Sequence, residues 1–132
     1  MRLSIGIDII EPGRFEPLLQ LSDIRLQRIW SSEELRYCRT KNTLRAAAES
    51  LAVRFAAREA TLKACAPYQR VAISFFAFSR LISITMQQGG PVLELDYQGL
   101  QRYYTFPEGI TFVLSVSHNT IAAVAVVIAS VG

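Results

Sequence analysis

Residues 46–65 form a run that is rich in alanine and contains neither glycine nor proline. Alanine has the highest helix propensity of all residues, whereas glycine and proline most disfavour a helix interior. Pro67 follows two residues after the end of the run, where a residue without an amide hydrogen prevents the helix from continuing. The pattern predicts one long helix over residues 46–65, around which the other elements have to pack.

The other segments predict a mixed fold. The apolar run at residues 3–10 indicates a buried strand, and Ser31 with Glu34 has the spacing of a helix capping box. We expect that helix to end near Arg39, further helical turns at residues 14–19 and 100–104, and strands at residues 71–78, 81–87, 92–96, 110–117 and 120–129. This order predicts a single α+β domain over residues 1–132, in which an antiparallel sheet packs on one long helix.

The composition predicts whether the protein contacts other subunits or a membrane, and in which compartment it lies. Apolar residues make up 51% of the 132 residues, and the mean hydropathy is positive, so we expect part of the surface to pack against another subunit. The apolar run at residues 121–129 is too short to span a bilayer, and residues 2–10 do not resemble a signal peptide. Cys38 and Cys65 lack metal-binding spacing and are expected to be reduced thiols, with a disulfide between them as the alternative. We therefore expect a cytoplasmic protein without a membrane segment.

Charge is unevenly distributed along the chain. The formal net charge is +3, but residues 1–70 carry +4 and residues 71–132 carry −1. A basic N-terminal half favours an anionic partner or substrate. An ordinary solvated surface would show the same pattern, so charge alone leaves both readings open.

Two carboxylates lie in otherwise apolar segments. Asp8 is within the strand predicted at residues 3–10, and Glu59 is within the long helix with Lys63 one turn later. Taken singly, Asp8 could cap a nearby helix, and Glu59 could be solvated or paired with Lys63. Taken together, the two acids match the one or two carboxylates that typically hold Mg²⁺ beside a substrate phosphate, which Lys63 could also bind.

Three further polar residues are candidates for binding phosphate. Arg54 and Arg58 lie one turn apart on the long helix, and His118 is the only histidine, in a predicted turn between two strands. The arginines could instead form a solvated helix face, and a single histidine in a turn is often incidental. The residues alone leave both readings open.

These residues, in this order, resemble the holo-acyl-carrier-protein synthase family, the small single-domain class of 4′-phosphopantetheinyl transferases. The resemblance covers nearly the whole chain and rests on four motifs. They are Gly6-Ile7-Asp8-Ile9-Ile10-Glu11 with Arg14, Arg54-Phe55-Ala56-Ala57-Arg58-Glu59-Ala60 with Lys63-Ala64, Gly90-Pro91 before a strand, and Ser115-Val116-Ser117-His118. The order and spacing of all four are specific, whereas each motif alone is weak.

The resemblance implies an enzyme that moves 4′-phosphopantetheine from coenzyme A to a serine of an apo acyl carrier protein and releases adenosine 3′,5′-bisphosphate. It implies Mg²⁺ on Asp8 and Glu59, with Lys63 as a third catalytic residue. It also implies a homotrimer that binds coenzyme A between subunits and serves an acidic carrier protein. The implied coenzyme A contacts are Arg54, Arg58, Lys63, Gly90, Pro91, Ser117 and His118, and the implied carrier-docking residues are Arg14, Arg25 and Arg28. A metal-bound water or Glu59 would accept the serine proton.

The chain also departs from the family pattern. Arg58 replaces a usual lysine, residues 65–70 replace a glycine-rich turn, and Gly90 stands where a lysine is common. The altered segment at 65–70 raises the alternative of a non-catalytic subunit that binds coenzyme A or a carrier protein. A nucleic-acid-binding module, suggested by a sequence pI near 9.1, is less favoured because the sequence shows no basic stripe with interleaved aromatics.

Overall fold

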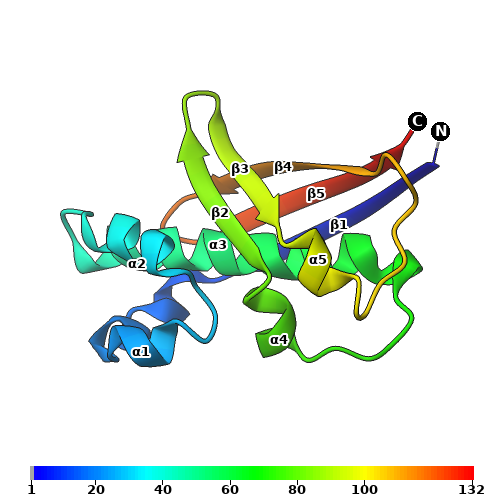
Figure 1. Cartoon of the computed structure of the whole chain (residues 1–132). Helices are drawn as coiled ribbons and strands as arrows, with labels where there is room; N and C mark the ends of the chain where they lie inside the picture. The colour runs from blue at the N-terminus through cyan, green and yellow to red at the C-terminus, as the bar shows by residue number, and fades with distance from the viewer. Residues whose placement is uncertain (1) are drawn as a thin grey trace.

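The central element is helix α3, Leu44–Cys65, which runs along the molecule in the computed structural model, where residues 2–132 are described (Figure 1). Thr43 caps its start by accepting a hydrogen bond from the Ala46 amide at 3.0 Å. Small side chains allow other elements to approach α3 closely: a Cβ added to Gly6 would lie 1.8 Å from the Ala60 carbonyl oxygen. The predicted long helix is confirmed.

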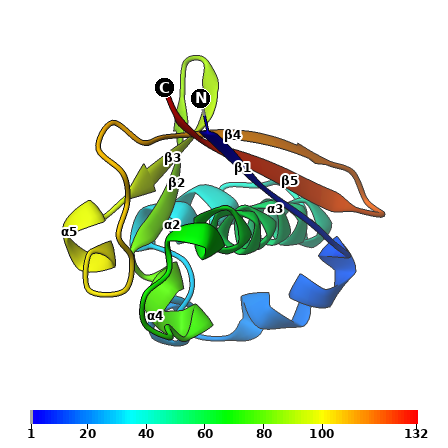
Figure 2. The same cartoon turned by 90° about the vertical axis from the view of Figure 1, so that its right-hand side faces the viewer.

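An antiparallel sheet of three strands covers one side of α3 (Figure 2). Its strands lie in the order β1 (Arg2–Ile10), β5 (Ala123–Val131) and β4 (Thr111–His118). Strands β2 (Ile82–Gln87) and β3 (Gly90–Leu95) form a separate antiparallel hairpin. The predicted α+β fold with antiparallel pairing on one long helix is therefore confirmed, with the strands divided between two sheets.

Short helices join these elements. Helix α2 (Ser32–Arg39) has the predicted capping box, because Ser31 Oγ accepts from the Glu34 amide while the Glu34 carboxylate accepts from the Ser31 amide. The other short helices are η1 (Pro12–Phe15), η2 (Pro17–Gln20), α1 (Asp23–Leu26), η3 (Ala66–Tyr68), α4 (Phe75–Ser79) and α5 (Tyr97–Leu100).

Three local predictions were wrong. No strand forms at residues 71–78: residues 71–74 belong to no strand, and residues 75–79 form helix α4, because Ser74 caps it through the Ala77 amide and Phe78 turns into the core. The helical turns expected at residues 100–104 begin earlier, because Asp96 accepts from the Gly99 amide. The segment 14–19 is split between two 3-10 helices, with Pro17 at the start of the second.

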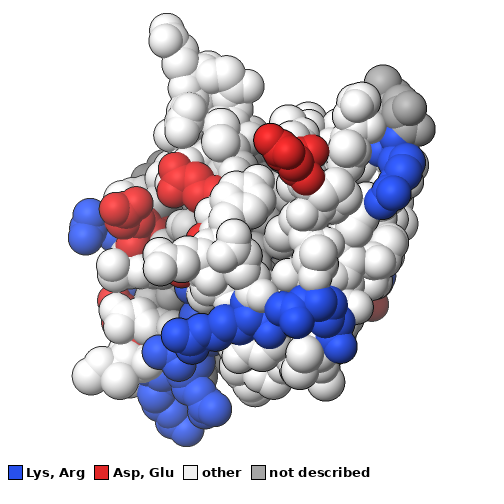
Figure 3. Space-filling view, turned by 45° about the vertical axis from the view of Figure 1, so that its right-hand side comes forward, with Lys and Arg blue, Asp and Glu red and all other residues white. Residues whose placement is uncertain are grey.

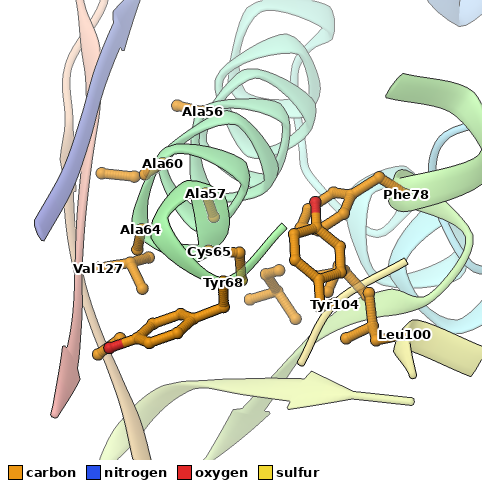
Figure 4. Close-up of a cluster of buried hydrophobic side chains, with 14 residues drawn as sticks. Ala56, Ala57, Ala60, Ala64, Cys65, Tyr68, Phe78, Leu100, Tyr104 and Val127 are labelled. Carbon is orange, nitrogen blue, oxygen red and sulfur yellow. The ribbon is translucent and has the colours of Figure 1, made fainter. Parts of the chain in front are cut away.

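The core lies on both sides of α3 (Figure 4). Ala60 and Ala64 point toward the strands near Val127, whereas Phe78 and Tyr104 lie on the other side of the helix. Cys38 and Cys65 are buried free thiols, and burial raises the pKa of Cys65 to about 12. No helix within residues 2–132 is both long and apolar enough to cross a bilayer.

The three-stranded sheet has an apolar face turned away from α3. From Leu3 to Ile10 the burial of strand β1 alternates, so that Gly6 and its even-numbered neighbours face the helix. Large apolar side chains therefore lie exposed on the opposite side, which we call the outer face: Leu3, Ile5, Ile7, Ile9, Val113 and Ile128. The expectation that the first strand is buried was wrong for this face within the single chain.

Candidate functional site

Asp8 and Lys63 meet where β1 crosses α3. Asp8 lies on the helix-facing side of β1, and Lys63 lies in the last turn of α3. The Lys63 ammonium is 3.3 Å from Asp8 Oδ1 and donates to the Ile7 carbonyl at 2.8 Å. Because the Lys63 side chain is 52% exposed, solvent and a bound ligand can reach this pair.

Glu59 belongs to the same site, one turn before Lys63 on α3. Its pKa is raised, first by partial burial and then by the negative charge of Asp8, while Lys63 lowers it. The effect of Asp8 shows that the two carboxylates are close enough to repel each other. The structure thus brings the predicted carboxylate pair together with its lysine.

This donor set fits a hard divalent cation. Asp8 and Glu59 offer only oxygen atoms, and two converging carboxylates would be relieved of their repulsion by a cation. No cluster of three or more metal-binding side chains occurs among residues 2–132. Such a cation would therefore have to complete its shell with water and substrate oxygens, as Mg²⁺ commonly does.

A second group of predicted residues forms part of the lining of a pocket of about 170 Å³. Arg54 from α3, Pro91 from β3 and His118 from the end of β4 all line it. His118 Nδ1 lies 2.9 Å from Glu49 Oε1, which holds the ring at the pocket wall. Three of the residues expected to bind coenzyme A are thus adjacent in space.

Arg54 is held firmly at this pocket. Its side chain is only 4% exposed, and Nη1 donates to the Ser50 carbonyl at 3.0 Å and to Ser50 Oγ at 2.7 Å. The guanidinium carbon lies 4.7 Å from the centre of the Tyr37 ring. Tyr37, Ser50 and Glu49 were not predicted as site residues, although the spacing of four between Ser50 and Arg54 is a usable helical signal.

Arg58 lies elsewhere, and the expectation that it contacts coenzyme A is corrected. Its side chain is fully buried, and it donates to both carboxylate oxygens of Glu34 and to the carbonyl oxygens of Ser79 and Ile82. These partners leave the guanidinium no path to a surface ligand. The alternative reading of Arg58 as part of a solvated helix face is equally wrong.

The two parts of the site lie on different sides of α3. Arg54 and Glu59 are five residues apart, which turns one side chain roughly 140° from the other around a helix axis. The carboxylates adjoin β1, whereas the Arg54 pocket adjoins α2 and β3. A single chain therefore presents two separate half-sites.

The remaining predicted residues lie at the surface. Gly90 begins β3 with a φ of 114°, which favours glycine, and Ser117 is exposed near the end of β4. Arg14, Arg25 and Arg28 are exposed, with the Arg28 guanidinium 4.9 Å from the Phe76 ring. Lys and Arg also gather in a band across one face (Figure 3), a concentration that the order of residues in the sequence does not reveal.

Comparison with known proteins places these features in a family context. A family model described as the 4′-phosphopantetheinyl transferase superfamily matches residues 4–123. The chain is 36% identical to the holo-[acyl-carrier-protein] synthase of Geobacter sp. (strain M21) over 124 residues, covering 93% of this chain and 94% of that protein. It is 37% identical to the protein of the same name from Treponema denticola over 128 residues, covering 97% and 98%.

Solved structures agree with the sequence matches. The ACPS–CoA complex of Chronobacterium ammoniagenes has a TM-score of 0.74 at 24% identity and covers 98% of this chain and 97% of its own, which shows the fold. A holo-(acyl-carrier-protein) synthase from Bacillus anthracis str. Ames, in complex with CoA (3′,5′-ADP), has a TM-score of 0.68 at 29% identity and covers 96% and 94%.

Proposed function

This chain belongs to the 4′-phosphopantetheinyl transferase superfamily, and on that premise we propose that it is a holo-acyl-carrier-protein synthase. It would transfer 4′-phosphopantetheine from coenzyme A to a serine of an apo acyl carrier protein and release adenosine 3′,5′-bisphosphate. The convergence of Asp8, Glu59 and Lys63 where β1 meets α3 is the observation that carries this proposal. Both the family match and the names of the relatives support it.

The reaction exchanges one phosphorus–oxygen bond for another. The serine oxygen bonds to the phosphorus that carries the pantetheine arm, and the bond from that phosphorus to the bridging pyrophosphate oxygen breaks. Lys63 is half-exposed beside Asp8 and would contact the pyrophosphate. Either Glu59 or a water molecule in the site would accept the serine proton.

Asp8 and Glu59 would also hold a divalent metal ion, for which we propose Mg²⁺. When bound, the ion would neutralise negative charge on the phosphate oxygens. In its absence, Lys63 offsets part of the repulsion between the two carboxylates. The proposal for the ion rests on the oxygen donors of this pair and their mutual repulsion.

We further propose that coenzyme A bridges two neighbouring subunits of a homotrimer. The carboxylate half-site would hold its pyrophosphate, and the pocket with Arg54, Pro91 and His118 would hold its nucleotide end, assisted by Gly90 and Ser117. The separation of these half-sites around α3 supports a ligand shared between subunits. The exposed apolar outer face supports assembly, because such a surface is rarely left in contact with water.

An acidic carrier protein would dock on the exposed arginines of the N-terminal helices. Arg14 lies beside a surface hollow lined by Ile9 and Ile121, and Arg28 packs on Phe76. Arginines next to apolar side chains can bind both the charge and the apolar surface of a partner protein. Their surplus of positive charge would also speed the encounter with an acidic partner.

The decisive experiment incubates the protein with coenzyme A, Mg²⁺ and an apo acyl carrier protein, followed by intact mass spectrometry of the carrier. We expect the carrier to gain the mass of one phosphopantetheine group. A protein that binds coenzyme A but leaves the carrier mass unchanged, with Mg²⁺ or Mn²⁺, would be a non-catalytic binding subunit. The segment after Lys63, with η3 in place of a glycine-rich turn, is the feature that would account for that outcome.

A further inference from the structure

We propose that Tyr37 is a positioning residue that gathers Arg54 and Lys41 into one phosphate-binding subsite, and that Lys41 is its second binding cation. The proposal rests on the proposed function, because it assigns the subsite to the terminal phosphate monoester of coenzyme A. Tyr37, Lys41 and Arg54 all line the pocket next to His118. The sequence motifs drew attention to Arg54 and His118 but to neither of the other two.

The Tyr37 ring is in contact with two cations. The Arg54 guanidinium carbon lies 4.7 Å from the ring centre, and the Lys41 ammonium lies 4.4 Å from it. Lys41 Nζ also donates to Tyr37 Oη at 3.1 Å. An aromatic face attracts cations, so the ring can hold both of them at this pocket despite their like charges.

Within residues 2–132, Arg54 keeps one donor without a partner at this pocket. The Nε of Arg54 is buried and has no hydrogen-bond partner among the described residues. Its nearest carboxylate oxygen, Glu34 Oε2, is 3.9 Å away and already accepts from Arg58 at 2.8 Å. Glu49, the carboxylate that lines the pocket, is engaged by His118. A buried guanidinium donor without an acceptor destabilises the protein, so an anion that accepts its hydrogen bond would bind favourably here.

The chemistry of the subsite selects a phosphate monoester over a diester. A monoester concentrates about −1.5 to −2 charges on one phosphorus at pH 7, whereas each phosphorus of a pyrophosphate diester carries only one, so two cations at one phosphate favour the monoester. Coenzyme A has one monoester, on its ribose, besides the pyrophosphate diester. Lys41 is exposed and can move onto the phosphate, whereas Arg54 is fixed by Ser50 and Tyr37.

The test compares dissociation constants for coenzyme A and dephospho-coenzyme A, which lacks the ribose monoester, by calorimetry on the whole purified protein. We expect the wild type to prefer coenzyme A. Tyr37→Leu should reduce that preference about tenfold, because it removes the ring from both cations. Tyr37→Phe and Lys41→Met should each reduce it about threefold, because each removes one charge-assisted contact.

Affinity for dephospho-coenzyme A should stay constant in all three variants, which separates a positioning role from general damage to the fold. Arg36→Met, an exposed change on the same helix, is the matched control and should leave both constants unaltered. An unchanged preference in Lys41→Met and Tyr37→Phe would overturn the inference, even if Tyr37→Leu did not fold. A wild type that modifies the carrier protein but binds both ligands equally would overturn it while leaving the proposed function intact.

Discussion

Arg58 and Glu34 form a bidentate ion pair inside the protein: Nη1 donates to Oε2 at 2.8 Å and Nη2 to Oε1 at 2.5 Å, with both side chains essentially unexposed. The same guanidinium donates to the carbonyl oxygens of Ser79 and Ile82. Glu34 in turn completes the capping box of α2. One pair thus joins the start of α2, the middle of α3 and the chain between α4 and β2.

Breaking this pair should destabilise the protein strongly. Arg58→Met leaves Glu34 as a buried carboxylate without its partner, so we expect a loss of about 3–5 kcal/mol in the free energy of unfolding. Urea denaturation measures the loss, and Arg102→Met, at an exposed arginine, should change it by less than about 0.5 kcal/mol. A loss below about 1 kcal/mol for Arg58→Met would show that the pair is not a major stabilising contact.

Removal of either carboxylate at the β1–α3 site should abolish turnover without dissociating the protein. Asp8→Ala and Glu59→Ala each remove a ligand of the proposed ion, and we expect transfer rates to fall at least about a hundredfold. Chelation of divalent metal should have the same effect on the wild type, and added Mg²⁺ should reverse it. Glu108→Ala, at an exposed acidic residue, is the control. Near-normal rates in both mutants would make the two carboxylates structural.

Carrier docking should depend on Arg14. Arg14→Glu places a negative charge where an acidic partner is expected, so the KM for the carrier protein should rise about tenfold. The KM for coenzyme A should change little, because Arg14 lines neither half-site. The exposed Arg102, changed to glutamate, serves as the charge-matched control. Equal effects of Arg14→Glu on both substrates would argue against docking.

The outer face of the sheet should hold the subunits together. Ile5 is 61% exposed in the single chain and faces away from α3. Ile5→Glu would bring a charge into the proposed interface, so we expect light scattering to show a trimer for the wild type and monomers for the variant. Activity should fall in parallel, since a monomer offers only separated half-sites. A monomeric wild type with full activity would remove the basis for this assembly.

The buried thiols should be unreactive in the native protein. Burial raises the pKa of Cys65 to about 12, and burial also raises the pKa of Cys38 above its ordinary value. Because only the thiolate reacts, both should resist a disulfide reagent at pH 8 and react rapidly after unfolding. Rapid labelling of Cys65 in the folded state would show that the helix end opens readily.

Much of the site could be predicted because its residues occur in recognisable local patterns. Glu59 and Lys63 are one helical turn apart, and the long helix itself follows from the composition of a single segment. Arg58 could not be placed in the same way. Its spacing from Arg54 predicts only a shared helix side, whereas its burial depends on Glu34, Ser79 and Ile82 from other parts of the chain.

Elements whose stability is local can be predicted from the sequence alone. Helix α3 follows from alanine propensity, and the start of α2 follows from the reciprocal hydrogen bonds of Ser31 and Glu34. Helix α4 shows the limit, because its three phenylalanines suit a strand equally well until the core that receives Phe78 is known.

Which charges lie together follows from the packing of the strands and helices against one another. Asp8 and Glu59 are brought within electrostatic reach by the close crossing of β1 over α3 at Gly6, and Tyr37 meets Arg54 across two helices. Propensities and caps act within a few residues, whereas burial and charge pairing join segments that are far apart in the chain.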